Sequence, residues 1–441
     1  MKPINYIVLL FIALFLSFTI IDSSHRWQKP NTIIANDIIC YNSYLVATVI
    51  KHDINDLPWG IDVGNNKKVA KVSMGMALLY SPFFFIADVF ANPSDKGADE
   101  GFSAPYQLAL FIGSMIYLLV GLFFLSKFLL NFFSNKIVAL TIILLFFGTN
   151  LYAYATLHPL MPHSYSFSLI AIFLYLSQKW HMNTNYRNSI LLGLIIGLFT
   201  LARPANTTVL IFFLFWNVYN WKSFRMKLIF YKENYLKLLI VLIFFLVVWI
   251  PQIIYWKYTT GSFFINGYNF SNERAYFNNP QIILGLFSYR NGWLLYTPLM
   301  FFALFGIFIM FKKMKSFFLG SLLYITLTIY LVLSWWCWWY SGFGNRAFVD
   351  SYSLLAIPLA CTLTYLFQRN IIIKIITSIV LLFFIWLNIF QTAQSVTGAI
   401  NYTAMTKKAY WANFGKLQPV PNLYYYLDFP DCDKAVKGIT D

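Results

Sequence analysis

Charged side chains are scarce in this sequence, and acidic ones are the scarcest. Only 11% of the 441 residues are charged, with 16 Asp plus Glu against 32 Lys plus Arg, whereas 59% are hydrophobic. No soluble domain needs that much apolar surface, so the composition excludes this class. The formal net charge of +16 could suggest a nucleic-acid partner. The basic residues instead stand in short loops between apolar runs, which is typical of topology signals and of contact with anionic lipid, so we expect no nucleic-acid binding.

Cysteine is also rare, and several common functional motifs are missing. The four cysteines, Cys40, Cys337, Cys361 and Cys432, lack metal-ligand spacing. Cys361 falls inside an apolar run, which leaves three on the outer side and argues against a framework of paired disulfides. There is no Gly-Lys-Ser/Thr phosphate loop, no dinucleotide-binding glycine fingerprint and no nucleophilic serine elbow. A nucleotide-powered engine is therefore not supported.

What is abundant is long apolar sequence. Runs able to cross about 30 Å of hydrocarbon predict an all-α, polytopic membrane protein with about eleven transmembrane helices. The first of them follows Lys2 and lacks a small-residue cleavage site, so we expect it to stay uncleaved. Met76 to Phe90 is shorter and contains Pro82, which predicts an interfacial piece. The predicted spans are 4–21, 106–129, 137–156, 164–178, 189–204, 206–220, 237–257, 294–311, 317–334, 351–367 and 371–390.

The loop charges predict the orientation. With the N-terminus in the cytoplasm, the cytoplasmic loops are short and basic, and Glu233 is their single acid. The other acids fall on the outer side or in a span, which hints at outward-facing chemistry. The abundance of Lys, Asn, Ile and Phe hints at a bacterium, so we expect a multi-pass protein of the inner (cytoplasmic) membrane with a periplasmic C-terminus. The cytoplasmic loops are 131–136, 179–187, 221–237, 312–315 and 368–374.

This topology divides the chain into a transmembrane domain, 1–390, and an outer tail, 391–441. The first outer loop, 22–105, would carry juxtamembrane interfacial helices, and a second large outer loop covers 258–293. The tail has no spanning run and is too small to fold alone. Aromatic residues make up 20% of the chain, which suits interfacial belts and stacking on sugar faces.

A lone carboxylate early in the first outer loop is the strongest candidate for catalysis. Asp37, Tyr41 and Tyr44 follow the spacing i, i+4, i+7, so on a short helix the acid would share one face with two phenols. We interpret Asp37 as a general base on the non-cytoplasmic side, with Tyr41 and Tyr44 contacting sugar or acceptor. The alternative is a helix N-cap whose acid faces water.

Four cations are candidates for binding a donor phosphate. Lys71 precedes the interfacial piece at the depth of lipid headgroups, although it could simply snorkel. Arg346 follows glycines that let the backbone approach a ligand, and a guanidinium holds phosphate oxygens in a bidentate way; its alternative is an i, i+4 ion pair with Asp350. Arg290 and Arg203 lie at predicted outer ends, where each alone could be structural but both would help stabilise an anionic leaving group.

Further candidates contact the sugar or the acceptor. Trp338 and Trp339 stand beside Arg346 and could stack on a sugar ring. His158 and His163 flank a Pro-Leu-Met-Pro segment whose two prolines make a poor frame for zinc, so no metal site or other cofactor is predicted, although a divalent metal is conceivable. Asp99 and Glu100 are most simply a solvated turn, with acceptor or metal binding as the alternative.

Together these features resemble the GT-C class of integral membrane glycosyltransferases. The branch is that of the protein O-mannosyltransferases and the lipid A aminoarabinose transferase, glycosyltransferase family 39-like. The similarity covers roughly residues 1–365: a first span, a long outer loop with an early acid (Asp37), a lysine before an interfacial piece (Lys71), and a late outer arginine (Arg346) before a span containing Pro358. One departure is that relatives usually have Asp-Pro where this chain has His158-Pro159.

The resemblance implies Asp37 as base or acceptor-binding carboxylate, with Lys71 and Arg346 on the phosphate of a polyprenyl-linked sugar. We therefore expect a glycosyltransferase that moves a sugar from a polyprenyl-phosphate donor to an acceptor hydroxyl on the periplasmic side, with inversion. The alternative is a flippase or transporter of a lipid-linked saccharide, which should carry internal repeats and helices broken at mid-membrane. The sequence does not specify the sugar or whether the acceptor is protein, lipid or glycan.

Overall fold

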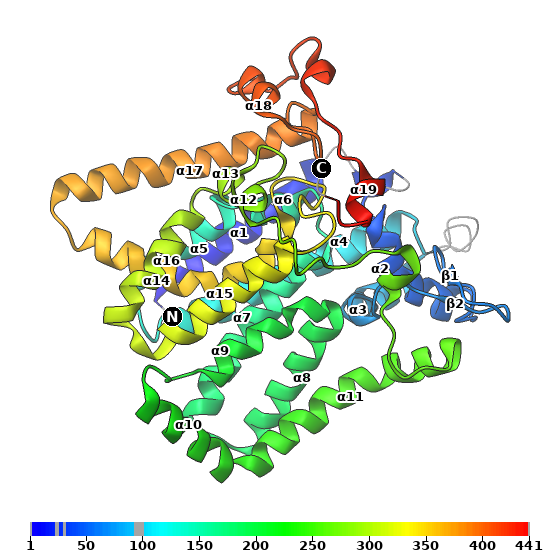
Figure 1. Cartoon of the computed structure of the whole chain (residues 1–441), viewed down its shortest axis with the longest axis horizontal. Coiled ribbons are helices and arrows are strands. Elements are labelled where there is room, and N and C mark those ends of the chain that lie inside the picture. Colours follow the sequence, from blue (N-terminus) through cyan, green and yellow to red (C-terminus); the bar gives the residue numbers. More distant parts are fainter. Residues whose placement is uncertain (1, 23–25, 30–31, 92–100, 440–441) are drawn as a thin grey trace.

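The computed structural model describes residues 2–22, 26–29, 32–91 and 101–439, and helices dominate it (Figure 1). Five helices of this part are long and apolar enough to cross a membrane, so the chain is a helical membrane protein. The larger number of eleven spans remains a prediction. The five are α4 (Ala104–Leu129), α11 (Tyr235–Thr260), α15 (Lys315–Leu333), the continuous turn and helix η6–α16 (Arg346–Ser351, Tyr352–Phe367) and α17 (Ile371–Thr397).

The other elements are shorter. They are α1 (Pro3–Asp22), η1 (Arg26–Gln28), α2 (Asp37–Leu45), the π-helical turn η2 (Val46–Ile50), β1 (Ile61–Asp62), β2 (Lys68–Val69), α3 (Gly75–Phe90), α5 (Asn135–Phe147), α6 (Leu151–Thr156), α7 (Pro162–Met182), α8 (Tyr186–Ala202), η4 (Pro204–Val209), α9 (Leu210–Leu214), α10 (Trp221–Glu233), η5 (Gly267–Ser271), α12 (Ile282–Phe287), α13 (Trp293–Tyr296), α14 (Met300–Lys313), α18 (Lys407–Asn413), η7 (Leu423–Tyr426) and α19 (Cys432–Val436).

Most predicted spans coincide with a helix, but three are interrupted. The run 137–156 divides at Gly148 into α5 and α6, and 294–311 divides at Pro298 between α13 and α14. The run 206–220 forms only a 3₁₀ turn after Pro204 and the five-residue α9. Proline lacks the N–H that a continuing helix needs. Hydropathy alone does not register such interruptions.

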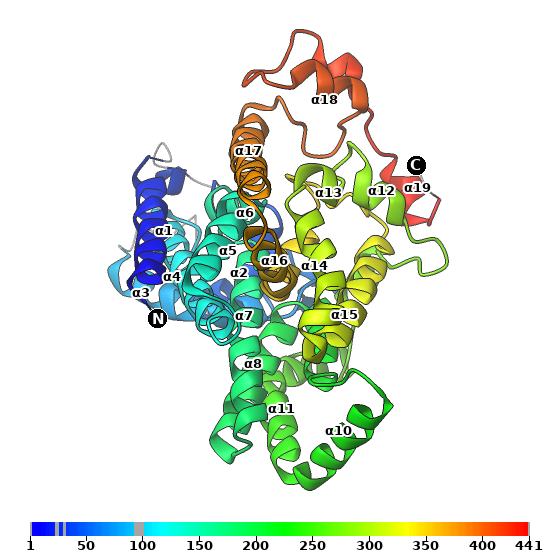
Figure 2. The ribbon, with the colours of Figure 1, turned by 90° about the vertical axis from the view of Figure 1, so that its left-hand side faces the viewer.

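Helix α16 is the centre of the bundle. Its apolar window is 94% buried, whereas that of α11 is only 11% buried. α16 packs on α14, α5 and α7, and Figure 2 shows it between α5 and α14. Along the chain, α4 packs on α7, α7 on α8, and α8 on α11. Because η6 begins at Arg346 and continues directly into α16, the core fixes the position of that arginine.

The predicted interfacial pieces lie together at one end of the bundle. Figure 1 shows α2, α3 and the short β1–β2 hairpin on the right. The strands pair antiparallel, Ile61 with Val69 and Asp62 with Lys68. Helix α3 contains Pro82, as the sequence suggested, and packs on α2, α4 and α8. Residues from both large loops and from the tail meet at this end.

Candidate active site

Asp37 forms an ion pair with Arg346. Asp37 opens α2, and its Oδ2 accepts a hydrogen bond of 3.0 Å from Arg346 Nη2, across 309 residues of sequence. The Asp37 side chain is 56% exposed and that of Arg346 is 24% exposed, so the carboxylate stays open to solutes. The alternative partner of Arg346, Asp350, is engaged elsewhere in the structure. The early acid and the late arginine therefore lie side by side.

The glycine-containing turn before Arg346 is hydrogen-bonded to α6 and to the residue that caps this helix. Gly342 has a φ of +148°, and a Cβ there would lie 2.4 Å from the Tyr154 hydroxyl. That hydroxyl accepts from the Phe343 N–H at 3.1 Å, and Asn150 Nδ2 donates to the Phe343 carbonyl at 3.2 Å. A side chain at position 342 would thus push the turn off α6. Glycine here allows the backbone contact that sets the direction of Arg346.

Lys71 is held by a residue of the second outer loop. Its Nζ lies 2.5 Å from Glu273 Oε1 and 5.1 Å from the centre of the Tyr268 ring. Gly267 makes the approach possible, because a Cβ at that position would lie 2.3 Å from the Lys71 carbonyl oxygen. Both charged side chains are mostly buried, with 29% of Lys71 and 16% of Glu273 exposed. Such burial makes the Coulomb attraction within this pair stronger than in an ordinary surface ion pair.

The loop that carries Glu273 is in turn bound to the strand-like segment that precedes Arg346. Ala275 and Trp335 form an antiparallel bridge, and the Tyr276 N–H donates to the Ser334 carbonyl at 2.6 Å. The Trp336 N–H donates to the Arg274 carbonyl at 3.2 Å. The second outer loop thus connects the lysine of the first loop to the segment that leads to the arginine.

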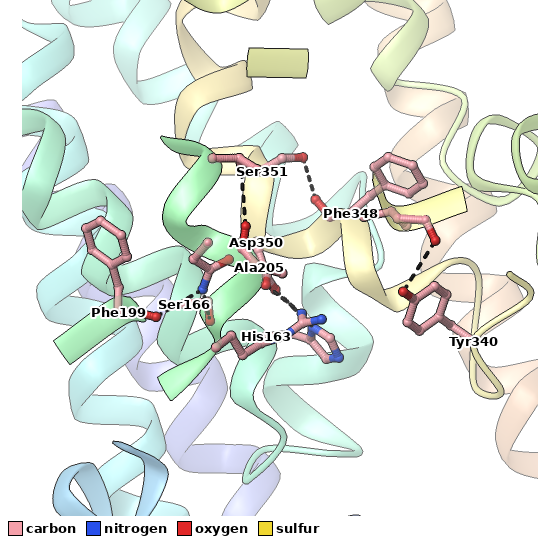
Figure 3. A network of polar contacts seen from close by, with 12 residues as sticks. His163, Ser166, Phe199, Ala205, Tyr340, Phe348, Asp350 and Ser351 are labelled. Atoms are coloured by element: carbon pink, nitrogen blue, oxygen red, sulfur yellow. Dashed lines mark hydrogen bonds and ion pairs between the residues drawn. The ribbon is translucent and has the colours of Figure 1, made fainter. Parts of the chain in front are cut away.

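The third cation, Arg203, is held by two buried ionisable residues, Asp350 and His163. Asp350 accepts from Arg203 Nη1 at 2.6 Å through one oxygen and from His163 Nδ1 at 2.9 Å through the other. Figure 3 shows His163 and Asp350 within this polar network. Only 3% of the His163 side chain and 8% of that of Asp350 are exposed, against 19% of that of Arg203. The histidine and the aspartate therefore fix a guanidinium that keeps some contact with solvent.

Tyr268 and Cys40 show that these ion pairs surround one region. Burial raises the pKa of Tyr268 to about 12, the charge of Arg203 lowers it, and those of Asp37 and Glu273 raise it. Burial likewise raises the pKa of the Cys40 thiol to about 11, with Asp37 adding to the effect and Lys71 opposing it. Both groups are therefore protonated at neutral pH. Tyr268 is thus subject to the charges of all three pairs, and Cys40 to those of Asp37 and Lys71.

The cluster has a chemistry suited to an anionic substrate. Asp37, Glu273 and Asp350 balance Arg346, Lys71 and Arg203, so the formal charge of the six groups is zero. A guanidinium has five N–H donors, and among the described residues the Arg346 side chain donates only to Asp37. The other donors remain for phosphate oxygens. A phosphate that binds Arg346 would also compete with Asp37 and release its carboxylate.

Several predicted site residues lie outside this cluster. Arg290 forms an ion pair with Asp428 of the tail at 2.7 Å, and its guanidinium lies 5.9 Å from the Trp339 ring centre. Trp338 and Trp339 are buried against Ala435 of α19, so neither presents a free face to a sugar. The structure thus gives Arg290, Trp338 and Trp339 contacts with the tail.

The phenols and imidazoles have mixed positions. Tyr44 is buried and its hydroxyl donates to the Val72 carbonyl at 2.8 Å, whereas Tyr41 is buried next to the cluster, where Asp37, Arg203 and Arg346 act on it. His158 is exposed, with its ring 5.8 Å from that of Tyr154, and His163 belongs to the Arg203 cluster. Asp99 and Glu100 lie outside the described residues.

The sequence did not single out Glu273, Tyr268 or Asp350 as site residues. A usable signal existed for Glu273, because it is the single acid of the loop 258–293, just as Asp37 stands alone in its stretch. The i, i+4 spacing predicts Asp350 only as a local partner of Arg346. No protein-family model matches the sequence, and no curated protein matches it either. Among the described residues, no three His, Cys, Asp or Glu side chains are grouped to hold a metal ion.

Proposed function

We propose that this protein is a membrane glycosyltransferase. In this proposal it transfers a sugar from a polyprenyl-phosphate donor to an acceptor hydroxyl on the periplasmic side of a bacterial inner membrane. The observation that carries the proposal is the meeting of a solvent-accessible carboxylate, Asp37, with Arg346, in a cluster that also contains Lys71 and Arg203. A base beside several cations suits attack by a hydroxyl on a carbon whose leaving group is a phosphate.

The proposed reaction is a displacement of the phosphate at the anomeric carbon of the donor sugar. The donor phosphate binds Arg346, with Lys71 and Arg203 nearby, and frees Asp37 to accept the proton of the acceptor hydroxyl. The acceptor oxygen then forms a bond to the anomeric carbon from the face opposite the phosphate, which gives inversion. The bond between that carbon and the phosphate oxygen breaks, and the phosphate leaves with the electron pair. Proton removal by a positioned base contributes about 10²- to 10⁴-fold to such a rate.

Asp37→Asn tests the role of the base. The variant keeps the size of the side chain but removes its charge, so transfer should fall at least about 100-fold while protein levels in the membrane hold. Asp428→Asn is the matched control, because it also breaks an aspartate–arginine ion pair, of 2.7 Å, away from the cluster. The assay is the release of polyprenyl phosphate from a set of polyprenyl-phosphate sugars in membranes that contain acceptor. Undiminished release in Asp37→Asn removes Asp37 from this role.

The same assay separates the enzyme from the competing flippase or transporter. A transporter moves the intact lipid-linked saccharide across the membrane and leaves the sugar–phosphate bond unbroken. Movement of donor that requires the cluster, with no free polyprenyl phosphate formed, would therefore favour transport.

A further inference from the structure

A second cluster of unusual polar groups lies away from the candidate active site, where α10 meets the end of α7. Figure 2 shows α10 at the lower end of the molecule, far from α18 and α19. Helix α10 is short and amphipathic, and its N-terminus is fixed by a capping box between Asn220 and Ser223. Met226, Leu228 and Ile229 on α10 are each more than half exposed. Such exposed apolar side chains suit a helix at the level of lipid headgroups.

Lys227 of α10 is a buried cation without a carboxylate. It is only 8% exposed, and its Nζ lies 4.6 Å from the Tyr231 ring centre and 5.1 Å from that of Phe230. Its ammonium group forms no hydrogen bond or ion pair with another described residue. Burial lowers the pKa of Lys227 to about 7. Burial without a carboxylate disfavours the charged form of a lysine, so an anionic ligand at Lys227 would stabilise the ammonium.

His181, near the end of α7, has an unused acceptor in the same place. Its ring is stacked between Trp216 (4.9 Å, 7°) and Phe230 (6.0 Å, 19°). Nδ1 lies 2.8 Å from the Ser177 carbonyl oxygen. Since a carbonyl only accepts, Nδ1 carries the proton, and Nε2 of the neutral imidazole is an acceptor. Nε2 is buried and has no partner.

Lys227 and His181 together suit a ligand that carries both an anionic acceptor and a hydrogen-bond donor. Lys227 and His181 both lie against Phe230, one offering N–H donors with a positive charge and the other a lone pair. The charge of Lys227 acts on the His181 ring, so the two groups are near each other. An anion alone would pair with Lys227 but would leave the lone pair of His181 without a donor. We propose that Lys227 and His181 form a binding site for a phosphate that carries a neighbouring hydroxyl, the chemistry of a glycerol-phosphate headgroup. The phosphate accepts from Lys227, and the hydroxyl donates to His181 Nε2.

The test measures stabilisation of the full-length protein in detergent. The melting temperature is followed while phosphatidylglycerol is titrated in, with phosphatidylethanolamine as a zwitterionic lipid and glycerol 3-phosphate as the same headgroup without acyl chains. Lys227→Met keeps the aliphatic stem but removes the charge. Lys232→Met is the matched control, because Lys232 is exposed on the same helix and the change in net charge is equal.

We expect phosphatidylglycerol to stabilise the natural protein and the Lys232→Met control alike. In Lys227→Met its apparent affinity should fall about tenfold, the size of a charge-assisted hydrogen bond, although this variant should melt higher in the absence of lipid because an unpaired buried charge is gone. His181→Phe, which keeps the ring stacking, should lose part of the affinity. Stabilisation by glycerol 3-phosphate alone would support the site and identify a soluble ligand. Equal losses in both lysine variants, or no stabilisation by either glycerol phosphate, would refute it.

Discussion

Asp350→Asn gives a test of the cluster that needs no knowledge of substrate. The substitution keeps the shape of the side chain but leaves Arg203, which is only 19% exposed, without its carboxylate. Removing one partner of a buried ion pair costs about 3–5 kcal/mol. Because part of the guanidinium still reaches solvent, we expect the lower end, about 3 kcal/mol. His163 loses its charged acceptor in the same step.

The assay is thermal unfolding of the purified protein in detergent, followed by tryptophan fluorescence. A second variant, Asp350→Leu with Arg203→Met, removes both charges and should recover most of the lost stability, since a buried pair is often replaceable by apolar residues. Asp428→Asn is the control, because Asp428 is 72% exposed and its pair with Arg290 should contribute no more than about 1 kcal/mol. The reasoning fails if Asp350→Asn melts like the control, or if the double variant is no more stable than the single one.

Three further predictions concern the residues around Asp37. Arg346→Lys keeps the charge but loses the planar fork of donors, so kcat/KM for the lipid-linked donor should fall about tenfold or more; an unchanged value in a transfer assay would contradict a bidentate role. Tyr268→Phe keeps the ring over Lys71 but removes a hydroxyl that is protonated at neutral pH and can therefore donate a hydrogen bond. The value of kcat/KM should drop about fivefold to tenfold with an unchanged melting temperature, and equal activity would exclude a role of this hydroxyl in transfer. Because the pKa of Cys40 is raised to about 11, only roughly one thiol in a thousand is ionised at pH 8. Alkylation of Cys40, followed by mass spectrometry, should therefore rise about tenfold per pH unit between pH 8 and pH 10 and should be faster in Asp37→Asn; a flat pH profile would show that another factor limits it.

Apolar runs predicted the helices well where no interrupting residue was present. The run 371–390 corresponds to α17, which ends seven residues later, and the run 106–129 to α4, which begins two residues earlier. The most strongly interrupted of the three runs is 206–220, where Pro204 and a 3₁₀ turn leave only five α-helical residues. Membrane hydropathy reports how apolar a segment is. It does not report whether the backbone can stay helical.

Only part of the cluster could be predicted from the sequence, and the pairing of its residues could not. Asp37, Lys71, Arg203 and Arg346 stood out because ionisable groups are rare in an apolar chain, and the structure brings them to one region. Their partners could not be assigned from sequence, since the pairs are 309, 202 and 147 residues apart. The local pairing rule for helices suggested Arg346 with Asp350 instead. The chain turn at Gly342 and the packing of η6 direct the two side chains to different partners.

The long separations within the three ion pairs have a consequence for biosynthesis. Asp37 and Lys71 are placed in the membrane early, whereas Arg346 and Asp350 emerge from the ribosome roughly 300 residues later, at speeds of about 5–20 residues per second. For tens of seconds the nascent protein therefore holds isolated carboxylates and cations at the bilayer boundary. Incomplete chains lack the late arginine, so the catalytic apparatus proposed here is absent until α16 has been inserted.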